Sequence, residues 1–206
     1  KVKLFFESPS LAADVAILDP EMTASMPPKL TAATGMDAMT HAVEALFSNN
    51  PSPLSDAWAL YAVKTVFEML PRAVQGEAAA RGPMLIASAA AGAAFSNSGV
   101  GVVHACAHAL GALMGIHHGT ANALMLPFGI AFNLEVRKRP ELGENLVERL
   151  ADLVKKCGLP TRLREVKVTP ERFGELAEYA ASDGALFTNA REATHEDLVG
   201  LFRNAY

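Results

Sequence analysis

The sequence has 206 residues, of which 50% are hydrophobic and 19% are charged, and its formal net charge is −4. This composition supplies a deep core, and the abundant alanine favours closely packed helices over a sheet. The weak negative charge and the lack of a large basic cluster argue against nucleic acid and anionic membranes as partners, and the longest apolar run is too short to span a bilayer. The two cysteines, Cys106 and Cys157, form no disulfide framework, so a reducing, cytoplasmic setting is expected.

The chain opens with KVKLFFESPSLAADVAILDP, which has no initiator methionine and reads as the continuation of a longer protein. We therefore expect residues 1–26 to be an extended segment arriving from an N-terminal domain, and residues 27–206 to form one helical domain. Within the first segment, ADVAILD at 13–19 predicts a short strand, because this apolar run ends at Asp19-Pro20.

From Pro27-Pro28 onward, apolar residues recur at helical intervals between breaks rich in proline, glycine and asparagine. Gly82-Pro83 is expected to interrupt or kink a helix made almost entirely of small residues. After Gly101 the chain is expected to turn into a further helix that carries several histidines. The other helices are expected at about 27–47, 55–70, 77–97, 119–137, 140–157, 170–183 and 195–205. The prediction is an all-α, multi-helix bundle-like domain with a short extended N-terminal segment.

Four of the six histidines lie in VVHACAHALGALMGIHHGT. His104 and His108 are four residues apart, so both project from one face of a helix, and Asp37 and His41 repeat that spacing in TGMDAMTH. For one pair alone, a hydrogen bond that braces a helix is an alternative explanation, and a single buried histidine can bind a carbonyl group. Two such pairs and a histidine at a glycine turn favour a metal site. One aspartate oxygen with three imidazole nitrogens is a normal ligand set for zinc or ferrous iron.

The two long motifs DPEMTASMPPKLTAATGMDAMTHAVEALFS and HACAHALGALMGIHHGTANALMLP resemble the metal-binding half of the iron-containing (group III) alcohol dehydrogenase family. The resemblance runs from about residue 8 to the C-terminus. It implies that Asp37, His41, His104 and His118 are the metal ligands, with Fe(II) as the ion and Zn(II) as the alternative. It further implies that His108 lies beside the metal, near the nicotinamide and the substrate, and is the catalytic residue.

The activity implied by this resemblance is the NAD(P)-dependent interconversion of alcohols with aldehydes or ketones, in which a divalent metal polarises the substrate oxygen. His108 could pass a proton or orient the substrate. NAD(P) would be bound mainly by an N-terminal α/β domain, which nothing in this sequence resembles, so the chain alone is expected to be inactive. The implied partners are a small alcohol or aldehyde and further copies of the chain, in a dimer or a larger homo-oligomer.

Several other residues are given narrower expectations. Glu44 either supports a metal ligand or is a solvated helix carboxylate. His117 matches no family position and is expected to be structural or solvent-facing, and His195 is expected to begin a helix. Asn122 is assigned no chemistry. TNAR at 188–191 stands where many relatives read N-P-R, which is expected to loosen that loop.

Other functions remain open from the residues alone. Maleylacetate reductases, glycerol dehydrogenases and dehydroquinate synthases share the architecture of the alcohol dehydrogenase family named above. The glycerol dehydrogenases and the synthases bind zinc with fewer or different ligands. A metal-dependent hydrolase on a helical scaffold would show phosphatase or esterase activity without nicotinamide. A non-catalytic helical module with merely buried histidines would bind no stoichiometric metal.

Overall fold

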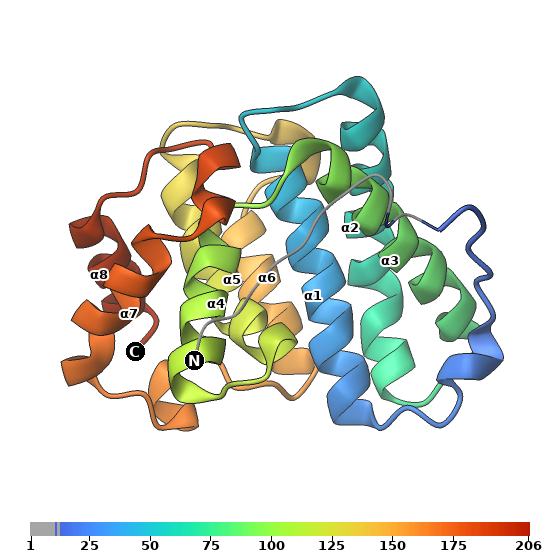
Figure 1. Cartoon of the computed structure of the whole chain (residues 1–206). Helices are drawn as coiled ribbons and strands as arrows, with labels where there is room; N and C mark the ends of the chain where they lie inside the picture. The colour runs from blue at the N-terminus through green and yellow to red at the C-terminus, as the bar shows by residue number, and fades with distance from the viewer. Residues whose placement is uncertain (1–10, 12) are drawn as a thin grey trace.

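The computed structural model describes residue 11 and residues 13–206, and this part of the chain is all-α (Figure 1). The described residues contain eight α-helices and several short 3-10 turns, without a strand. The all-α prediction is therefore confirmed. The α-helices are α1 (Pro28–Phe47), α2 (Pro53–Val74), α3 (Ala78–Ser98), α4 (Val102–Met114), α5 (His118–Leu134), α6 (Leu146–Lys156), α7 (Phe173–Ala181) and α8 (His195–Asn204).

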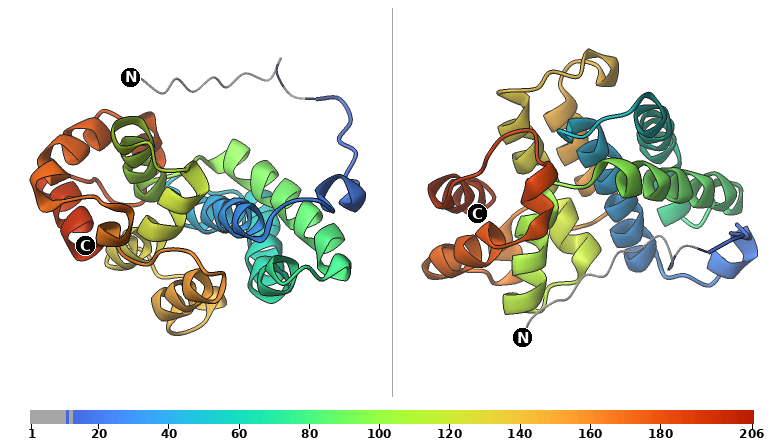
Figure 2. Two further views of the ribbon diagram at one scale, coloured as in Figure 1. Left: turned by 90° about the horizontal axis from the view of Figure 1, so that it is seen from below. Right: turned by 45° about the horizontal axis from the view of Figure 1, so that its top comes forward.

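Helix α1 occupies the middle of the molecule (Figures 1 and 2). It packs on α2 and α3 on one side and on α5 on the other, while α4 packs on α5 and α7, and α7 packs on α8. Most of the residues of α1 are buried, because neighbouring helices surround it. The three helices that carry the histidine motifs, α1, α4 and α5, are therefore brought together at the centre of the fold.

Two glycines of α5 permit the close approach of these helices. A Cβ atom on Gly119 would lie 2.2 Å from the carbonyl oxygen of Ala33 in α1, and one on Gly129 would lie 2.5 Å from the Val103 side chain in α4. Neither position could carry a larger residue without displacing its neighbour, since packed atoms do not approach so closely. Because Gly119 follows His118 directly, its contact with α1 sets how near that histidine comes to the α1 side chains.

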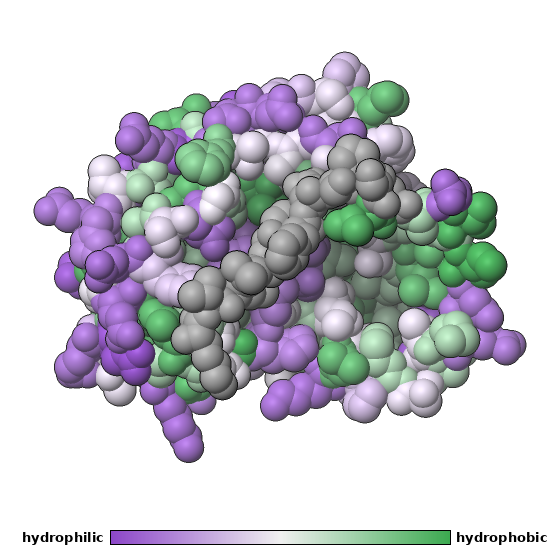
Figure 3. All heavy atoms as spheres, viewed as in Figure 1, coloured by the Kyte–Doolittle hydropathy of each residue, from purple (hydrophilic) through white to green (hydrophobic). Residues whose placement is uncertain are grey.

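The strand predicted at residues 13–19 is wrong. These residues are exposed and irregular, and they end at a 3-10 turn, Pro20–Thr23, whose first amide is capped by Asp19. A strand needs a neighbouring strand to pair with its backbone groups, and the described part of the chain offers none. Figure 3 shows hydrophobic side chains at the right edge of the molecule, where Figure 1 places this segment. Its exposed apolar residues include Val15, Ile17 and Leu18. Residues 1–10 and 12 of the predicted N-terminal segment lie outside the described residues.

Of the interruption or kink expected at Gly82-Pro83, the interruption is wrong, because α3 runs without a break through Pro83, and the kink stays a prediction. Pro83 lies near the start of the helix, where its missing N–H removes a single hydrogen bond to Ala79. Ala79 is exposed, so its carbonyl can bind water instead. Helix α6 begins at Leu146 rather than near 140, because a separate 3-10 turn, Pro140–Leu142, ends at Gly143 with a positive φ of 79°.

The chain bends sharply between α3 and α4, at the glycines before the histidine motif. Gly99 has a φ of +87°, and a Cβ atom there would lie 2.3 Å from the Thr188 hydroxyl oxygen, so glycine is required. No single described helix is long and apolar enough to cross a membrane; α3 and α4 reach that length and composition only as a pair, which is bent by 105°.

Candidate metal centre

Three side chains from three helices converge at one point of the structure. Asp37 of α1, His104 of α4 and His118 of α5 each offer one ligand atom, and these atoms lie within 4.8 Å of one another. The distance between Asp37 Oδ1 and His118 Nε2 is 3.4 Å. The side chains of Asp37 and His118 are partly exposed, whereas that of His104 is buried. The group is therefore anchored in the core on the His104 side and open on the other.

Glu44 fixes the orientation and the tautomer of His104. The Nδ1 atom of His104 lies 2.6 Å from Glu44 Oε2, and the Glu44 side chain also accepts the backbone N–H groups of Val103, at 2.7 Å, and His104, at 3.3 Å. Because a carboxylate accepts hydrogen bonds, Nδ1 carries the proton and Nε2 presents its lone pair to Asp37 and His118. Glu44 is buried and hydrogen-bonded to His104, so of the two alternatives left open by the sequence the solvated helix carboxylate is wrong, and its support of a metal ligand stays a prediction.

His41 lies next to these three residues but is not one of the converging group. Its ring is stacked between Phe95, with centroids 4.2 Å apart, and His104, with centroids 4.5 Å apart. Burial lowers the pKa of His41 to about 4; the His104 and His108 charges also lower it, and Asp37 acts in the opposite direction. His41 is therefore neutral at neutral pH, which is the form that binds a metal ion.

We expect the metal-free chain to lose stability as the pH falls from about 6.5 to about 4, because of His41. In this window the unfolded chain, in which the pKa of His41 is 6.5, binds a proton that the folded chain does not bind. The pKa difference corresponds to a loss of about 3 kcal/mol in the free energy of unfolding. Urea titrations at several pH values measure this loss, which His41→Phe should reduce while keeping the stacked ring. The same dependence in His41→Phe as in the unaltered chain would contradict this assignment; the exposed His195→Asn is the control.

His108 forms a hydrogen bond with Asp183, a residue that the sequence analysis missed. The distance from His108 Nδ1 to Asp183 Oδ2 is 2.8 Å, and the ring of His108 is stacked on that of His118, with centroids 5.3 Å apart. Burial raises the pKa of Asp183, but hydrogen bonds from His108 and from the Ala185 amide outweigh burial and hold this pKa below its usual value. Asp183 also caps the following 3-10 turn, so its local sequence indicated only a turn.

Asn122 is a second residue whose part in the site the sequence did not indicate. It follows His118 by one turn of α5 and is fully buried. Its Nδ2 atom donates to Asp37 Oδ1 at 2.5 Å and lies 3.2 Å from His104 Nε2 and 3.3 Å from His118 Nε2. Its Oδ1 atom is buried without a hydrogen-bond partner among the described residues.

The remaining polar residues have structural positions. His117 is exposed, as expected, and His195 begins α8, also as expected. Asn189, in the TNAR loop, is buried; it accepts the Val102 N–H, at 3.1 Å, and exchanges side-chain hydrogen bonds with Asn133. Asn189 thus fastens this loop to the start of α4, a role that the sequence analysis missed.

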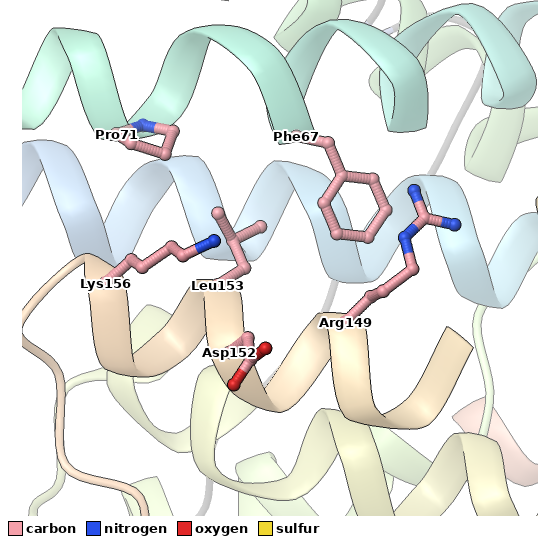
Figure 4. Close-up of a pocket in the computed structure, with 6 residues that line it drawn as sticks. All are labelled: Phe67, Pro71, Arg149, Asp152, Leu153 and Lys156. Atoms are coloured by element: carbon pink, nitrogen blue, oxygen red, sulfur yellow. The ribbon is translucent and has the colours of Figure 1, made fainter. Parts of the chain in front are cut away.

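Two hollows on the described surface lie apart from the histidines. One, of about 150 Å³, lies between α2 and α6, where Phe67 and Arg149 face each other with the guanidinium carbon 4.4 Å from the ring centroid (Figure 4). The other, of about 420 Å³, lies beside α5 and α8 and includes Arg191. Neither is lined by a histidine or by Asp37, so the convergent group is a separate site.

The chemistry of the convergent group fits a divalent cation. It combines one carboxylate with two imidazoles, one of which has its tautomer fixed by a buried carboxylate, as is usual around protein-bound zinc and iron. Asn122, whose buried Oδ1 atom has no hydrogen-bond partner among the described residues, lies beside these three residues and contacts them through Nδ2.

Comparison with known proteins agrees with this geometry. The profile of the Fe-containing alcohol dehydrogenase family, C-terminal, matches residues 31–206. The chain is 40% identical to a protein described as "Probable alcohol dehydrogenase EutG" from Escherichia coli, over 95% of this chain and 53% of that protein. It is 37% identical to the 1,3-propanediol dehydrogenase of Klebsiella pneumoniae, over 100% of this chain and 58% of that enzyme.

Solved structures lead to the same family. The iron-containing alcohol dehydrogenase from Thermococcus thioreducens matches with a TM-score of 0.90 and 33% identity, over 97% of this chain and 56% of that one. The chain spans about half the length of the curated relatives that it matches. From the profile match and these similarities, the chain belongs to the iron-containing alcohol dehydrogenase family and corresponds to its C-terminal region.

Proposed function

We propose that this chain is the metal-binding part of an NAD(P)-dependent alcohol dehydrogenase that interconverts small alcohols with aldehydes or ketones. The observation that carries the proposal is the convergence of Asp37, His104 and His118 from three helices. The alcohol and propanediol dehydrogenases among its relatives support the substrate class. NAD(P) would be bound mainly by residues outside this chain, because such relatives are almost twice as long.

The proposed metal ligands are Asp37, His104 and His118, with His41 as the fourth. The proposed ion is Fe(II), with Zn(II) as the alternative, because both accept nitrogen and oxygen ligands. When bound, the ion would act as a Lewis acid toward the substrate oxygen. The buried free cysteines support a reducing, cytoplasmic setting, and membership of this family leads us to propose a homo-oligomer, a dimer or larger.

We assign His108 the handling of the substrate proton. Its Nδ1–H donates to Asp183, so its Nε2 atom has a free lone pair for the proton of an alcohol hydroxyl. Asp183 would stabilise the imidazolium that results and hold the ring in place. Because its ring is stacked on that of His118, His108 would lie near an ion held there and near a substrate oxygen bound to that ion.

A chimera tests the proposed function without the complete natural protein. Residues 31–206 would replace the matching C-terminal region of the Klebsiella pneumoniae 1,3-propanediol dehydrogenase, which is 37% identical to this chain. We expect metal-dependent, NAD(P)-linked oxidation of a short alcohol by the chimera and none by the 206-residue chain. A folded, metal-loaded chimera that oxidises no alcohol, while the parent enzyme does, would contradict the proposal.

In the same chimera, Asp183→Asn is expected to lower kcat by about 10- to 100-fold with little change in KM, because one amide oxygen cannot accept from both His108 and the Ala185 amide, and the charge that would stabilise the imidazolium is lost. Asp183→Glu should restore part of kcat, since a carboxylate is retained. Stopped-flow NADH formation and a metal assay separate this effect from metal loss. Equal losses in Asp183→Asn and Asp183→Glu, accompanied by unfolding, would show that Asp183 is only a structural cap.

A further inference from the structure

The amide nitrogen of Asn122 lies among the three converging side chains. Its Nδ2 atom lies within 3.3 Å of one side-chain atom on each of Asp37, His104 and His118. These are the three residues whose ligand atoms converge. Nδ2 donates to the Asp37 carboxylate, and the partial positive charge of the NH2 group favours the ring nitrogen of His104 that carries a lone pair.

The other half of the same amide is unsatisfied. Asn122 Oδ1 is buried and has no hydrogen-bond partner among the described residues, although an unpaired buried carbonyl oxygen is costly. Turning the amide over without a cation would place this oxygen against the Asp37 carboxylate and the lone pair of His104, which is worse. The amide therefore keeps its NH2 group toward Asp37 and leaves its oxygen unpaired.

A bound cation would displace the NH2 group. An NH2 group facing a divalent ion is repelled, so its contacts with Asp37, His104 and His118 would be lost on binding. The torsion that turns an asparagine amide is soft, so the group can move away without moving α5.

We propose that Asn122 is a positioning residue for the metal site. Its amide nitrogen keeps the side chains of Asp37, His104 and His118 together in the metal-free chain, and it moves away from them when the ion binds. This inference rests on the proposed metal-binding function. It predicts that the hydrogen bonds of Asn122 stabilise the metal-free state more than the loaded state. By linkage, removing them strengthens metal binding.

Asn122→Ala tests the inference by calorimetric titration with Zn(II) and by thermal unfolding with and without Zn(II). The metal-free variant should unfold at a lower temperature than the unaltered chain, and its Kd for Zn(II) should be lower by on the order of tenfold. Asn133→Ala is the matched control, because Asn133 is a buried asparagine of the same helix whose amide binds Asn189 instead. It should destabilise both states equally and leave the Kd unchanged.

A measurement on the unaltered chain needs no variant to fold. The side-chain NH2 signals of Asn122 in proton–nitrogen NMR spectra should show slow hydrogen exchange without metal and shift and exchange faster with Zn(II), while those of Asn133 stay constant. Three results would each overturn this inference and leave the proposed function standing. They are weaker Zn(II) binding by Asn122→Ala, an unchanged Kd in that variant, and NMR signals of Asn122 that do not respond to Zn(II). A failure of the unaltered chain to bind Zn(II) would overturn the proposed function, and this inference with it.

Discussion

His118→Ala is expected to weaken Zn(II) or Fe(II) binding by roughly 100-fold or more, whereas His117→Ala leaves the affinity unchanged. The two residues are adjacent, but only His118 lies in the convergent group, 3.4 Å from Asp37 Oδ1, while His117 is exposed and its side chain makes no capping hydrogen bond. Calorimetric titration of the two variants measures the difference. The adjacent pair is a close control, because both changes remove one imidazole at the start of α5.

Equal effects of the two substitutions would contradict the assignment of the site. If both variants bound metal as well as the unaltered chain, the histidine cluster would be a packing feature. If both lost metal together with their helical content, the start of α5 would be needed for folding, and His118→Gln, which keeps a polar side chain of similar length, would take the place of the alanine variant.

Glu44→Gln is expected to have the second large effect, on stability as well as on metal binding. The Glu44 carboxylate faces three N–H groups, from the Val103 and His104 backbone and from the His104 ring. A glutamine has one carbonyl oxygen, so its NH2 group would face a donor in a buried site. We expect a loss of about 2–4 kcal/mol in the free energy of unfolding and metal binding about 10- to 100-fold weaker.

Urea unfolding of the metal-free chain and Zn(II) titration measure these two losses separately. Glu178→Gln, at an exposed position on α7, is the matched control and should change neither quantity beyond about 0.5 kcal/mol. A Glu44→Gln variant as stable as the Glu178→Gln variant would show that the Glu44 carboxylate does not fix His104.

The helices and the motif pairs could be predicted from the sequence, because both depend on residues close along the chain. The spacing of Asp37 and His41, or of His104 and His108, fixes a shared helix face whatever the tertiary structure. The structure places Asp37, His104 and His118 together, as the ligand set requires, and leaves His41 stacked beside them. The assignment of all four as ligands stays a prediction.

The supporting contacts could not be predicted, because they join residues far apart in sequence. Asp183 is 75 positions from His108, and Asn122 is 85 positions from Asp37. Each has a local explanation that hides its role: Asp183 caps a 3-10 turn, and Asn122 is a polar residue within a helix. The strand predicted at 13–19 was wrong for the same physical reason, since apolar composition alone cannot supply a pairing partner.

The central claim, that three helices of this chain hold a site for one divalent metal ion, is tested most directly by the metal stoichiometry of the unaltered chain. Calorimetric titration with Zn(II), and with Fe(II) under anaerobic conditions, should saturate at about one ion per chain, and elemental analysis after gel filtration should return the same ratio. Binding that does not saturate, or a ratio that is the same in His104→Ala as in the unaltered chain, would contradict the claim.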